Sequence, residues 1–361
     1  MNHAVMPVII VGFFALLILA MRVVYPAFLR AGHKIKAPGV DLTENALIGG
    51  VRQTLCIRGE DIANPAILFL HGGPGTPMIP FIHGWQYDLE KDFTIVQWDQ
   101  RNTGRTFKLN DPDSVLKTLS IERAVEDVYE VSQYMKEKLG KAKIIIVGHS
   151  WGTVLGSAFV QKYPQNCSAY IGVGQATNMR DNERVGYQAA LDAARGAGNK
   201  ADITALEALA PYPPPKPYDE SLNSEIYKLR KIQGKYKHAA SGLTVLPLAF
   251  TSPYYTLSEI MVPLRGMEKL RCQEPLMRFL FDEYDLHDFG TAYEVPVFYI
   301  MGEHDYNTPY PLAKSFFEEI SAPGKAFFTI PGAGHEPMLS NKAEFRRVMV
   351  EEIKPLLNGG A

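Results

Sequence analysis

Cysteine is scarce in this chain of 361 residues, and its scarcity argues against two classes of protein. The three cysteines, Cys56, Cys167 and Cys272, are odd in number, lie far apart and form no C-x-x-C pair. A disulfide framework needs paired cysteines, and a structural zinc site needs closely spaced ones. We therefore expect three small buried side chains, no disulfide framework and no metal site.

The chain also lacks an excess of charge of either sign. Its 39 acidic and 37 basic residues give a formal net charge of −2. Proteins that bind nucleic acids usually carry a strongly basic patch or domain, so we expect no nucleic-acid partner. Hydrophobic residues make up 46% of the chain and charged residues 21%, which is an ordinary globular balance.

One long hydrophobic run lies at the N-terminus. Residues 4–21 carry no charged side chain, which is about the minimum length for crossing a bilayer. No Lys or Arg precedes the run, unlike a secretory signal peptide, and basic residues from Arg22 to Lys36 follow it. The hydrophobic run predicts a single-pass membrane anchor over 1–36. By the positive-inside rule, the basic residues after the run predict that the rest of the chain lies in the cytoplasm. A cleaved signal and a helix docked on the following domain are the alternatives.

The chain is too long to form a single hydrophobic core, because such cores stop growing at about 250–300 residues. Strand patterns alternate with helical ones up to about residue 176 and return at 295, which predicts a parallel sheet covered on both faces. The stretch between them has helical patterns and a proline-rich connector at 211–217. We expect four segments: an anchor at 1–36, a first part of the core at 37–176, a helical cap at 177–291 and a second part of the core at 292–361.

The stretch over residues 143–153 is the most informative one. Residues 144–147 are β-branched and predict a buried strand, and a helical pattern begins at Thr153. Between them lies Gly148-His-Ser-Trp-Gly152, so that strand, G-x-S-x-G and helix follow in the order of a nucleophile elbow. Such a turn exposes the hydroxyl of Ser150 at the carboxyl end of the sheet. It also directs the N–H of Trp151 to where negative charge would develop.

A serine nucleophile needs a base, and the base needs a group that orients it. In elbow-bearing folds the acid and then the histidine follow the serine along the chain. Asp305 comes directly after a predicted strand at 295–301, and His335 comes soon after another at 326–330. We therefore predict that His335 is the base and Asp305 orients it, with Glu303 as the alternative acid.

A loop almost without side chains, His71-Gly-Gly-Pro-Gly75, follows the predicted strand at 66–70. Such a loop lets the backbone approach a substrate and offers free N–H groups. We predict that Gly73 and Trp151 supply an oxyanion hole, with Gly72 as the alternative to Gly73. We expect the side chain of His149 to point away from the serine.

Five motifs together resemble the proline iminopeptidase branch of the α/β-hydrolase superfamily over about 45–175 and 292–357. They are His71-Gly-Gly-Pro-Gly75, Trp98-Asp-Gln-Arg101 with Gly104-Arg105, Gly148-His-Ser-Trp-Gly-Thr153, Gly302-Glu-His-Asp305 and Gly334-His335. The resemblance implies a mostly parallel eight-stranded sheet with helices on both faces and a helical cap. It also implies no metal or cofactor, and the release of an N-terminal residue, often proline, from peptides.

Two features bear on the substrate. His149 stands where the peptidases often have glycine, and histidine there is common in esterases of the superfamily. The peptidases of the family hold the substrate's α-ammonium group with cap carboxylates. Glu183, Glu207 and Glu225 are the candidates here, and the solvated face of a cap helix is the alternative for each.

We therefore predict a serine hydrolase that forms an acyl-enzyme with a small peptide or another small acyl substrate. Within that class we favour an aminopeptidase of the proline iminopeptidase type. A carboxylic-ester or amide hydrolase acting on a small hydrophobic substrate is the alternative, because the same triad serves all three reactions.

Overall fold

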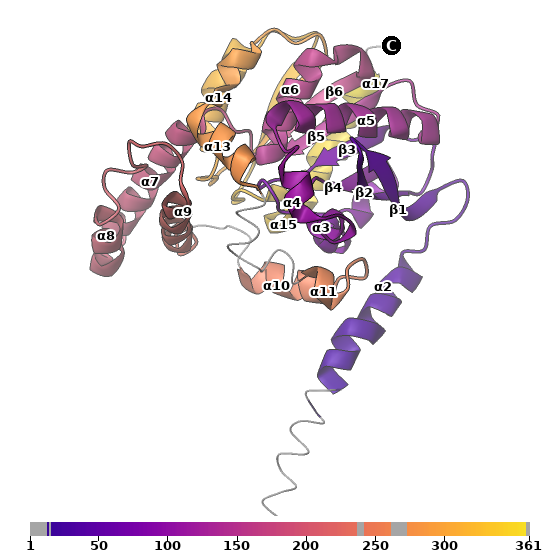
Figure 1. Ribbon diagram of the computed structural model, residues 1–361, viewed down its shortest axis with the longest axis horizontal. Coiled ribbons are helices and arrows are strands. Elements are labelled where there is room, and N and C mark those ends of the chain that lie inside the picture. The colour runs from indigo at the N-terminus through magenta and orange to yellow at the C-terminus, as the bar shows by residue number, and fades with distance from the viewer. Residues whose placement is uncertain (1–12, 14–15, 237–241, 261–272, 359–361) are drawn as a thin grey trace, which may run out of the picture.

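The computed structural model describes residue 13 and residues 16–236, 242–260 and 273–358. Its centre is an eight-stranded sheet with the order β1-β2-β4-β3-β5-β6-β7-β8 (Figure 1). The strands are β1 (Val40–Ile48), β2 (Val51–Gly59), β3 (Ala66–Leu70), β4 (Thr94–Asp99), β5 (Ile144–His149), β6 (Cys167–Val173), β7 (Val297–Gly302) and β8 (Lys325–Ile330). β2 runs antiparallel to both of its neighbours, and all other neighbouring pairs are parallel. The predicted mostly parallel eight-stranded sheet is thus confirmed.

A hairpin forms one edge of the sheet. β1 and β2 pair antiparallel and are joined by Gly49 and Gly50, whose φ angles are +53° and +77°. Two consecutive left-handed residues form the tight turn that matches the twist of a hairpin, and glycine adopts this conformation without strain.

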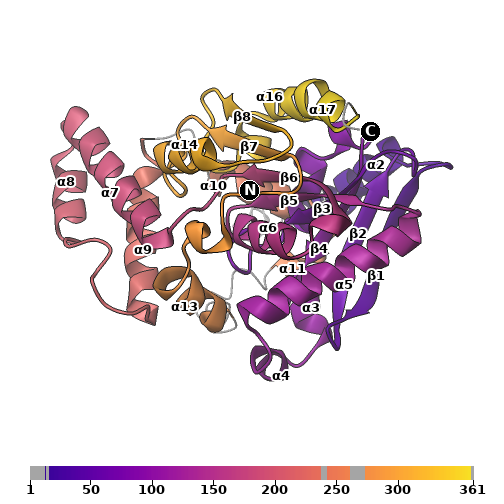
Figure 2. The same cartoon turned by 90° about the horizontal axis from the view of Figure 1, so that it is seen from above.

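Helices and short helical turns alternate with the other strands. They are η2 (Ile79–Gly84), η3 (Tyr87–Leu89), α3 (Gly104–Leu109), α4 (Pro112–Leu116), α5 (Ile121–Leu139), α6 (Trp151–Lys162), η4 (Pro164–Asn166), α14 (Tyr310–Glu319), α15 (Pro337–Ser340), α16 (Lys342–Arg347), η6 (Val348–Ile353) and α17 (Lys354–Asn358). α5 and α6 lie on one side of the strands, and α16 and α17 lie on the other (Figure 2).

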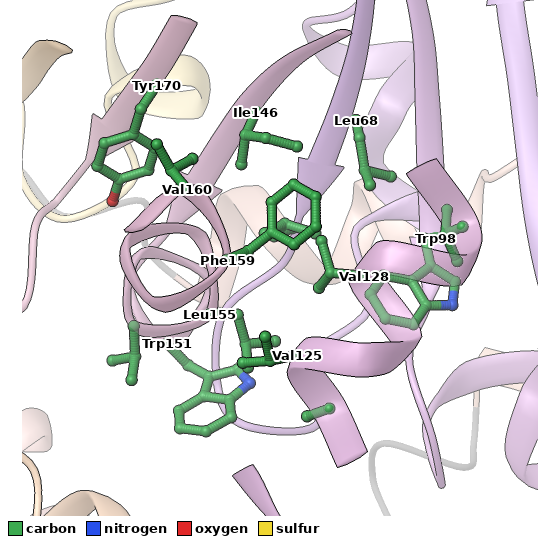
Figure 3. Close-up of a cluster of buried hydrophobic side chains, with 14 of the residues drawn as sticks. Leu68, Trp98, Val125, Val128, Ile146, Trp151, Leu155, Phe159, Val160 and Tyr170 are labelled. Carbon is green, nitrogen blue, oxygen red and sulfur yellow. The ribbon is translucent and has the colours of Figure 1, made fainter. Parts of the chain in front are cut away.

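The central strand β5 contributes to a core on each face of the sheet. Ile146 belongs to the core under α5 and α6, whereas Val147 belongs to the core under α16 and η6. Figure 3 shows Phe159 of α6 pointing toward Val128 of α5 and Leu68 of β3. Because both faces of β5 are covered, its residues are apolar without alternation, as expected for a parallel strand.

Helices alone fill the described part of the stretch between β6 and β7. They are α7 (Met179–Gly196), α8 (Lys200–Glu207), α9 (Glu220–Gln233), α10 (Gly242–Phe250), α11 (Leu257–Ile260), α13 (Glu274–Asp282) and the turn η5 (Leu286–Phe289). α7, α8 and α9 share a small apolar cluster and lie to one side of the sheet (Figure 1). The first part of the helix expected over 263–284 lies outside the described residues. A cap with bounds at 177 and 291 stays a prediction.

We predicted a membrane-spanning anchor over 1–36 and a cytoplasmic location for the rest of the chain. Both predictions are wrong. In the described part of the chain, no helix is both long and apolar enough to cross a bilayer. Most of the hydrophobic run, residues 1–12 and 14–15, lies outside that part. The helical residues that follow continue through η1 (Ala20–Val24) into α2 (Tyr25–Gly32).

Arg22 shows why composition alone misjudged this helix. Its guanidinium donates hydrogen bonds to the carbonyl oxygens of Tyr255, at 2.8 Å, and of Phe250. Arg30 likewise donates to the carbonyl of Pro253. These arginines bind the segment between α10 and α11, 223 to 233 residues away in sequence, and so anchor the helix to the protein itself.

The arginine of the WDQR motif holds the hairpin turn against α5. Arg101 and Asp127 are both buried and form an ion pair, and Arg101 also donates to the Gly49 carbonyl at 2.5 Å. Arg123 and Gln53 complete the network by donating to the two oxygens of Asp127, each at 3.0 Å. A buried charge is costly unless it is paired and hydrogen-bonded, so Arg101 depends on Asp127.

Asp127→Asn should lower the free energy of unfolding by roughly 3 kcal/mol, because it leaves the Arg101 guanidinium buried without its counter-charge. Glu126→Gln is the matched control at the preceding position. Its partner Lys162 is 54% exposed, and the loss should stay below about 1 kcal/mol. Urea unfolding measures both variants, and equally small losses would contradict the structural role of the pair.

Candidate active site

Ser150 sits in a strained turn between β5 and α6. Its φ of 54° and ψ of −120° are rare for a residue with a side chain. Two glycines make the turn possible. A Cβ on Gly148 would lie 2.3 Å from the carbonyl oxygen of Gly152, and one on Gly152 would lie 1.9 Å from that of Leu70. The G-x-S-x-G pattern is therefore a packing requirement at this point of the sheet.

The loops that follow β7 and β8 meet at the same sheet edge. Nδ1 of His335 lies 2.9 Å from Oδ2 of Asp305, and both residues are buried. Thr308 helps to hold the carboxylate, since its hydroxyl donates to Oδ2 at 2.8 Å and its backbone N–H donates to Oδ1 at 3.0 Å. The backbone N–H of Asn307 also donates to Oδ1, at 2.9 Å, so the imidazole is oriented by a carboxylate that three further donors fix.

Each member of this pair shifts the pKa of the other. Burial by itself would lower the pKa of His335, but the Asp305 carboxylate outweighs burial and raises the pKa above the ordinary histidine value. Burial would raise the pKa of Asp305, but His335 and the Thr308 donors outweigh it and lower the pKa. The pair therefore stabilises a protonated imidazole next to an ionised carboxylate.

Glu303, the alternative acid, does not contact His335. It is 52% exposed and accepts the backbone N–H of Gly332 at 2.9 Å. Of the two carboxylates that the sequence left open, Asp305 is therefore the one that meets the imidazole.

His149 lies elsewhere than we expected. Its ring packs against that of His335, with centroids 4.9 Å apart, and its Nε2 lies 2.9 Å from the His335 carbonyl oxygen. It lines the same cavity as Ser150 and so does not point away from the site. Burial, and then the neighbouring His335, lower the pKa of His149 to about 3, so this imidazole is neutral.

The cavity at this edge has a volume of about 310 Å³ and combines core loops with helices of the insertion. Its lining residues are Gly72, Gly73, Thr76, Met78, Phe81, His149, Ser150, Met179, Glu183, Ile226, Arg230, Val245, Met277, Leu280, Phe281, Asn307, His335, Glu336 and Leu339. Most of these side chains are apolar, as in small-molecule pockets generally. Three are charged: Glu183, Arg230 and Glu336.

The glycine loop is held against the elbow by Gln100 of the WDQR motif. The side-chain amide of Gln100 donates to the His71 carbonyl and accepts the indole N–H of Trp151, each at 3.2 Å. A Cβ on Gly72 would lie 3.1 Å from the Cβ of Ser150, so the loop backbone runs directly beside the serine. The predicted oxyanion residue Gly73 also lines the cavity.

The three predicted amine-binding acids differ in position. Glu183 of α7 lines the cavity, but Glu207 and Glu225 are absent from its lining. Glu207 is half exposed on α8 and pairs with Arg195 at 3.3 Å. The structure therefore brings only the first of these acids to the serine.

Glu183 already has a full set of partners. It is completely buried, forms an ion pair with Arg230 of α9, and accepts hydrogen bonds from Arg230 and from the Tyr212 hydroxyl. Its charge is therefore compensated from within the protein. Among the described residues, no group of three His, Cys, Asp or Glu side chains is arranged to hold a metal ion.

One charged residue of the lining, Glu336, did not emerge from the sequence. It directly follows His335, in the position that caps α15, but its carboxylate makes no capping hydrogen bond. Burial raises the pKa of this carboxyl group. The only signal in the sequence was its place next to the predicted base, and a charged residue there also fits an ordinary exposed loop.

Comparison with known proteins identifies the class. The family described as alpha/beta hydrolase fold matches residues 65–245, and the chain belongs to this family of hydrolases. A probable aminopeptidase of Bacillus subtilis strain 168 is 29% identical over 307 residues, which cover 84% of this chain and 93% of that protein. A probable proline iminopeptidase of Leptolyngbya boryana is 23% identical over 290 residues, covering 77% and 84%.

The fold is shared with a solved structure of the same branch. The proline iminopeptidase-related protein of Thermus thermophilus superposes with a TM-score of 0.56 at 20% identity, covering 88% of this chain and 99% of that one. That structure shows the shared fold, and the two relatives above support the branch that the five motifs indicated. The chain is thus a proline iminopeptidase-like member of the α/β hydrolases.

The two neighbouring histidines, His149 and His335, should titrate at very different pH values. Histidine-selective NMR should find that His335 gains its proton above the ordinary histidine pKa, while His149 stays neutral down to a pKa of about 3. Asp305→Asn should lower the pKa of His335, because it removes the charge that raises it. Two histidines with ordinary, equal titrations would contradict the geometry.

Proposed function

We propose that this hydrolase is a serine hydrolase in which Ser150 is the nucleophile, His335 the general base and Asp305 the group that orients it. The observation that carries the proposal is the buried 2.9 Å contact of Asp305 with His335, which lines the same cavity as the strained Ser150. No hydrogen bond joins Ser150 to His335 in the described structure. Such contacts often tighten only when substrate is bound.

In the proposed reaction, Ser150 attacks the substrate carbonyl as His335 accepts the hydroxyl proton. Asp305 keeps Nδ1 protonated, so that Nε2 is free to accept, and it stabilises the imidazolium that forms. His335 then returns the proton to the leaving group, and the acyl-enzyme remains. Water, deprotonated by the same imidazole, attacks the acyl-enzyme and releases the acid.

The negative charge of the tetrahedral intermediate needs donors. Trp151 is the first residue of the 12-residue helix α6, and backbone N–H groups at a helix start have no partner within the helix. The loop backbone at Gly72 runs beside the serine, and Gly73 lines the same cavity. We propose the N–H groups of Trp151 and Gly73 as the oxyanion hole.

For the substrate, we propose the N-terminal residue of a small peptide, with the activity of an aminopeptidase of the iminopeptidase type. The relatives in Bacillus subtilis, named a probable aminopeptidase, and in Leptolyngbya boryana, named a probable proline iminopeptidase, support this choice. An esterase or amidase acting on a small hydrophobic acyl group is the second candidate. The mostly apolar lining and the neutral His149 beside the serine favour it.

Ser150→Ala should reduce hydrolysis of aminoacyl arylamides and p-nitrophenyl esters by roughly 10³-fold or more, because it removes the nucleophile. Ser321→Ala, an exposed serine away from the cavity, is the control and should keep the parent's kcat/KM. Circular dichroism checks that both variants are folded. A Ser150→Ala enzyme within tenfold of the parent would rule out the assignment.

Asp305→Asn should lower kcat by about 10⁴-fold through the wrong tautomer of His335. Activity should fall as the pH drops through the pKa of His335, because a protonated imidazole cannot accept the serine proton. Since Asp305 raises that pKa, the acid limb of kcat/KM should move to lower pH in the variant. Glu303→Gln, with its carboxylate in solvent, should change neither quantity, and a larger effect from Glu303→Gln would mean that the wrong acid is assigned.

A further inference from the structure

We infer that Glu336 is the residue that selects substrates, by binding a protonated amine on the acyl part of the substrate. The inference rests on the proposed function and names the group that would distinguish an amine-bearing residue from a neutral acyl group. It also differs from the expectation for this branch, because the acid belongs to a loop of the core and lies outside the insertion helices.

The balance of charge in the cavity is the first argument. Among the three charged residues of its lining, Glu183 and Arg230 form an ion pair with each other. Glu336 has no cationic nitrogen within 4.0 Å in the described part of the chain, and the only hydrogen-bond donor found for its carboxylate is its own backbone N–H. Glu336 therefore stands in the cavity wall without a directly bonded counter-charge, and His335 and Arg230 act on it only through space.

The second argument is that the side chain of Glu336 does not cap the helix that follows it. It occupies the capping position of α15, where Asp, Asn, Ser or Thr normally satisfy the first backbone N–H groups. Its φ of −111° and ψ of 72° leave the side chain out of that role, and no capping hydrogen bond forms. Glu336 instead belongs to the lining of the cavity, together with His335 and Asn307.

A carboxylate in such a place is unfavourable without a ligand. Burial raises its pKa, which reflects the cost of keeping the charge away from water. A primary or secondary ammonium group supplies the missing counter-charge and donates a charge-assisted hydrogen bond, which is stronger than a neutral one. An uncharged acyl group would leave the carboxylate unpaired, so the residue both attracts amines and disfavours neutral substrates.

The position of Glu336 indicates which amine it binds. It follows His335 in the chain, so its α-carbon lies about 3.8 Å from that of the proposed base. The cavity holds only about 310 Å³. An amine bound there must therefore belong to the same small residue as the reacting carbonyl, which describes the free N-terminus of a peptide or an aminoacyl derivative.

The experiment compares two substrates that differ by one ring atom, L-proline p-nitroanilide and cyclopentanecarboxylic acid p-nitroanilide, with the cyclopentanecarboxylic p-nitrophenyl ester as a third. Glu336→Gln should lower kcat/KM for the prolyl substrate roughly 10- to 100-fold, the effect of losing a hydrogen bond to a charged group. It should change hydrolysis of the neutral ester less than about threefold. Glu336→Asp should recover part of the prolyl activity, and Glu207→Gln, on α8 outside the cavity, should behave as the parent.

Binding provides a test that does not depend on turnover. In the Ser150→Ala background, calorimetry should find that L-prolinamide binds more tightly than cyclopentanecarboxamide and that Glu336→Gln removes the difference. If both ligands bind equally, or if Glu336→Gln weakens both substrates alike, the inference is overturned. Hydrolysis of the neutral ester would then still support the serine hydrolase. Conversely, if the protein binds the amine selectively but hydrolyses no substrate, the role of Glu336 stands and the proposed reaction is rejected.

Discussion

The site depends on how closely α6 approaches the ends of β3 and β5. The carbonyl oxygen of Leu70 occupies the space that a side chain on Gly152 would need, and the backbone of Gly152 occupies the space next to Gly148. Only with glycine at both positions can the helix begin immediately after the strand. The same closeness forces Ser150 to a φ of 54° and directs its side chain to the sheet edge, where the loops after β7 and β8 also end.

Buried charge is handled in different ways around this edge. Asp127 is compensated by arginines and stabilises the hairpin turn. Asp305 is compensated by His335, and its carboxylate raises the pKa of the imidazole. Glu183 is compensated by Arg230, which joins α7 to α9. Glu336, next to the imidazole in the cavity wall, has no directly bonded counter-charge, and a bound cation would supply one.

The insertion is tied to the core by long-range polar contacts. Tyr255 donates its hydroxyl to the buried Asp99 of the WDQR motif, and Arg105 donates to the carbonyl of Tyr254. Arg22 and Arg30 of the N-terminal helical residues donate hydrogen bonds to backbone carbonyls of the same segment. The insertion supplies the helices that form the outer wall of the cavity. It is therefore hydrogen-bonded directly to the motifs that form the floor of the cavity.

Local sequence patterns predicted the sheet and the elbow, because each follows from the preferences of neighbouring residues. The order of strands also predicted that the loops of Asp305 and His335 end at the edge of Ser150. Local sequence patterns did not predict which residues distant in the sequence pair with each other. The membrane prediction was based on composition alone, and tertiary contacts gave Arg22 backbone partners more than 220 residues away. Glu183 and Arg230, 47 positions apart, neutralise each other only because α7 and α9 pack together, and that packing decides which carboxylate of the cavity is left to bind a ligand.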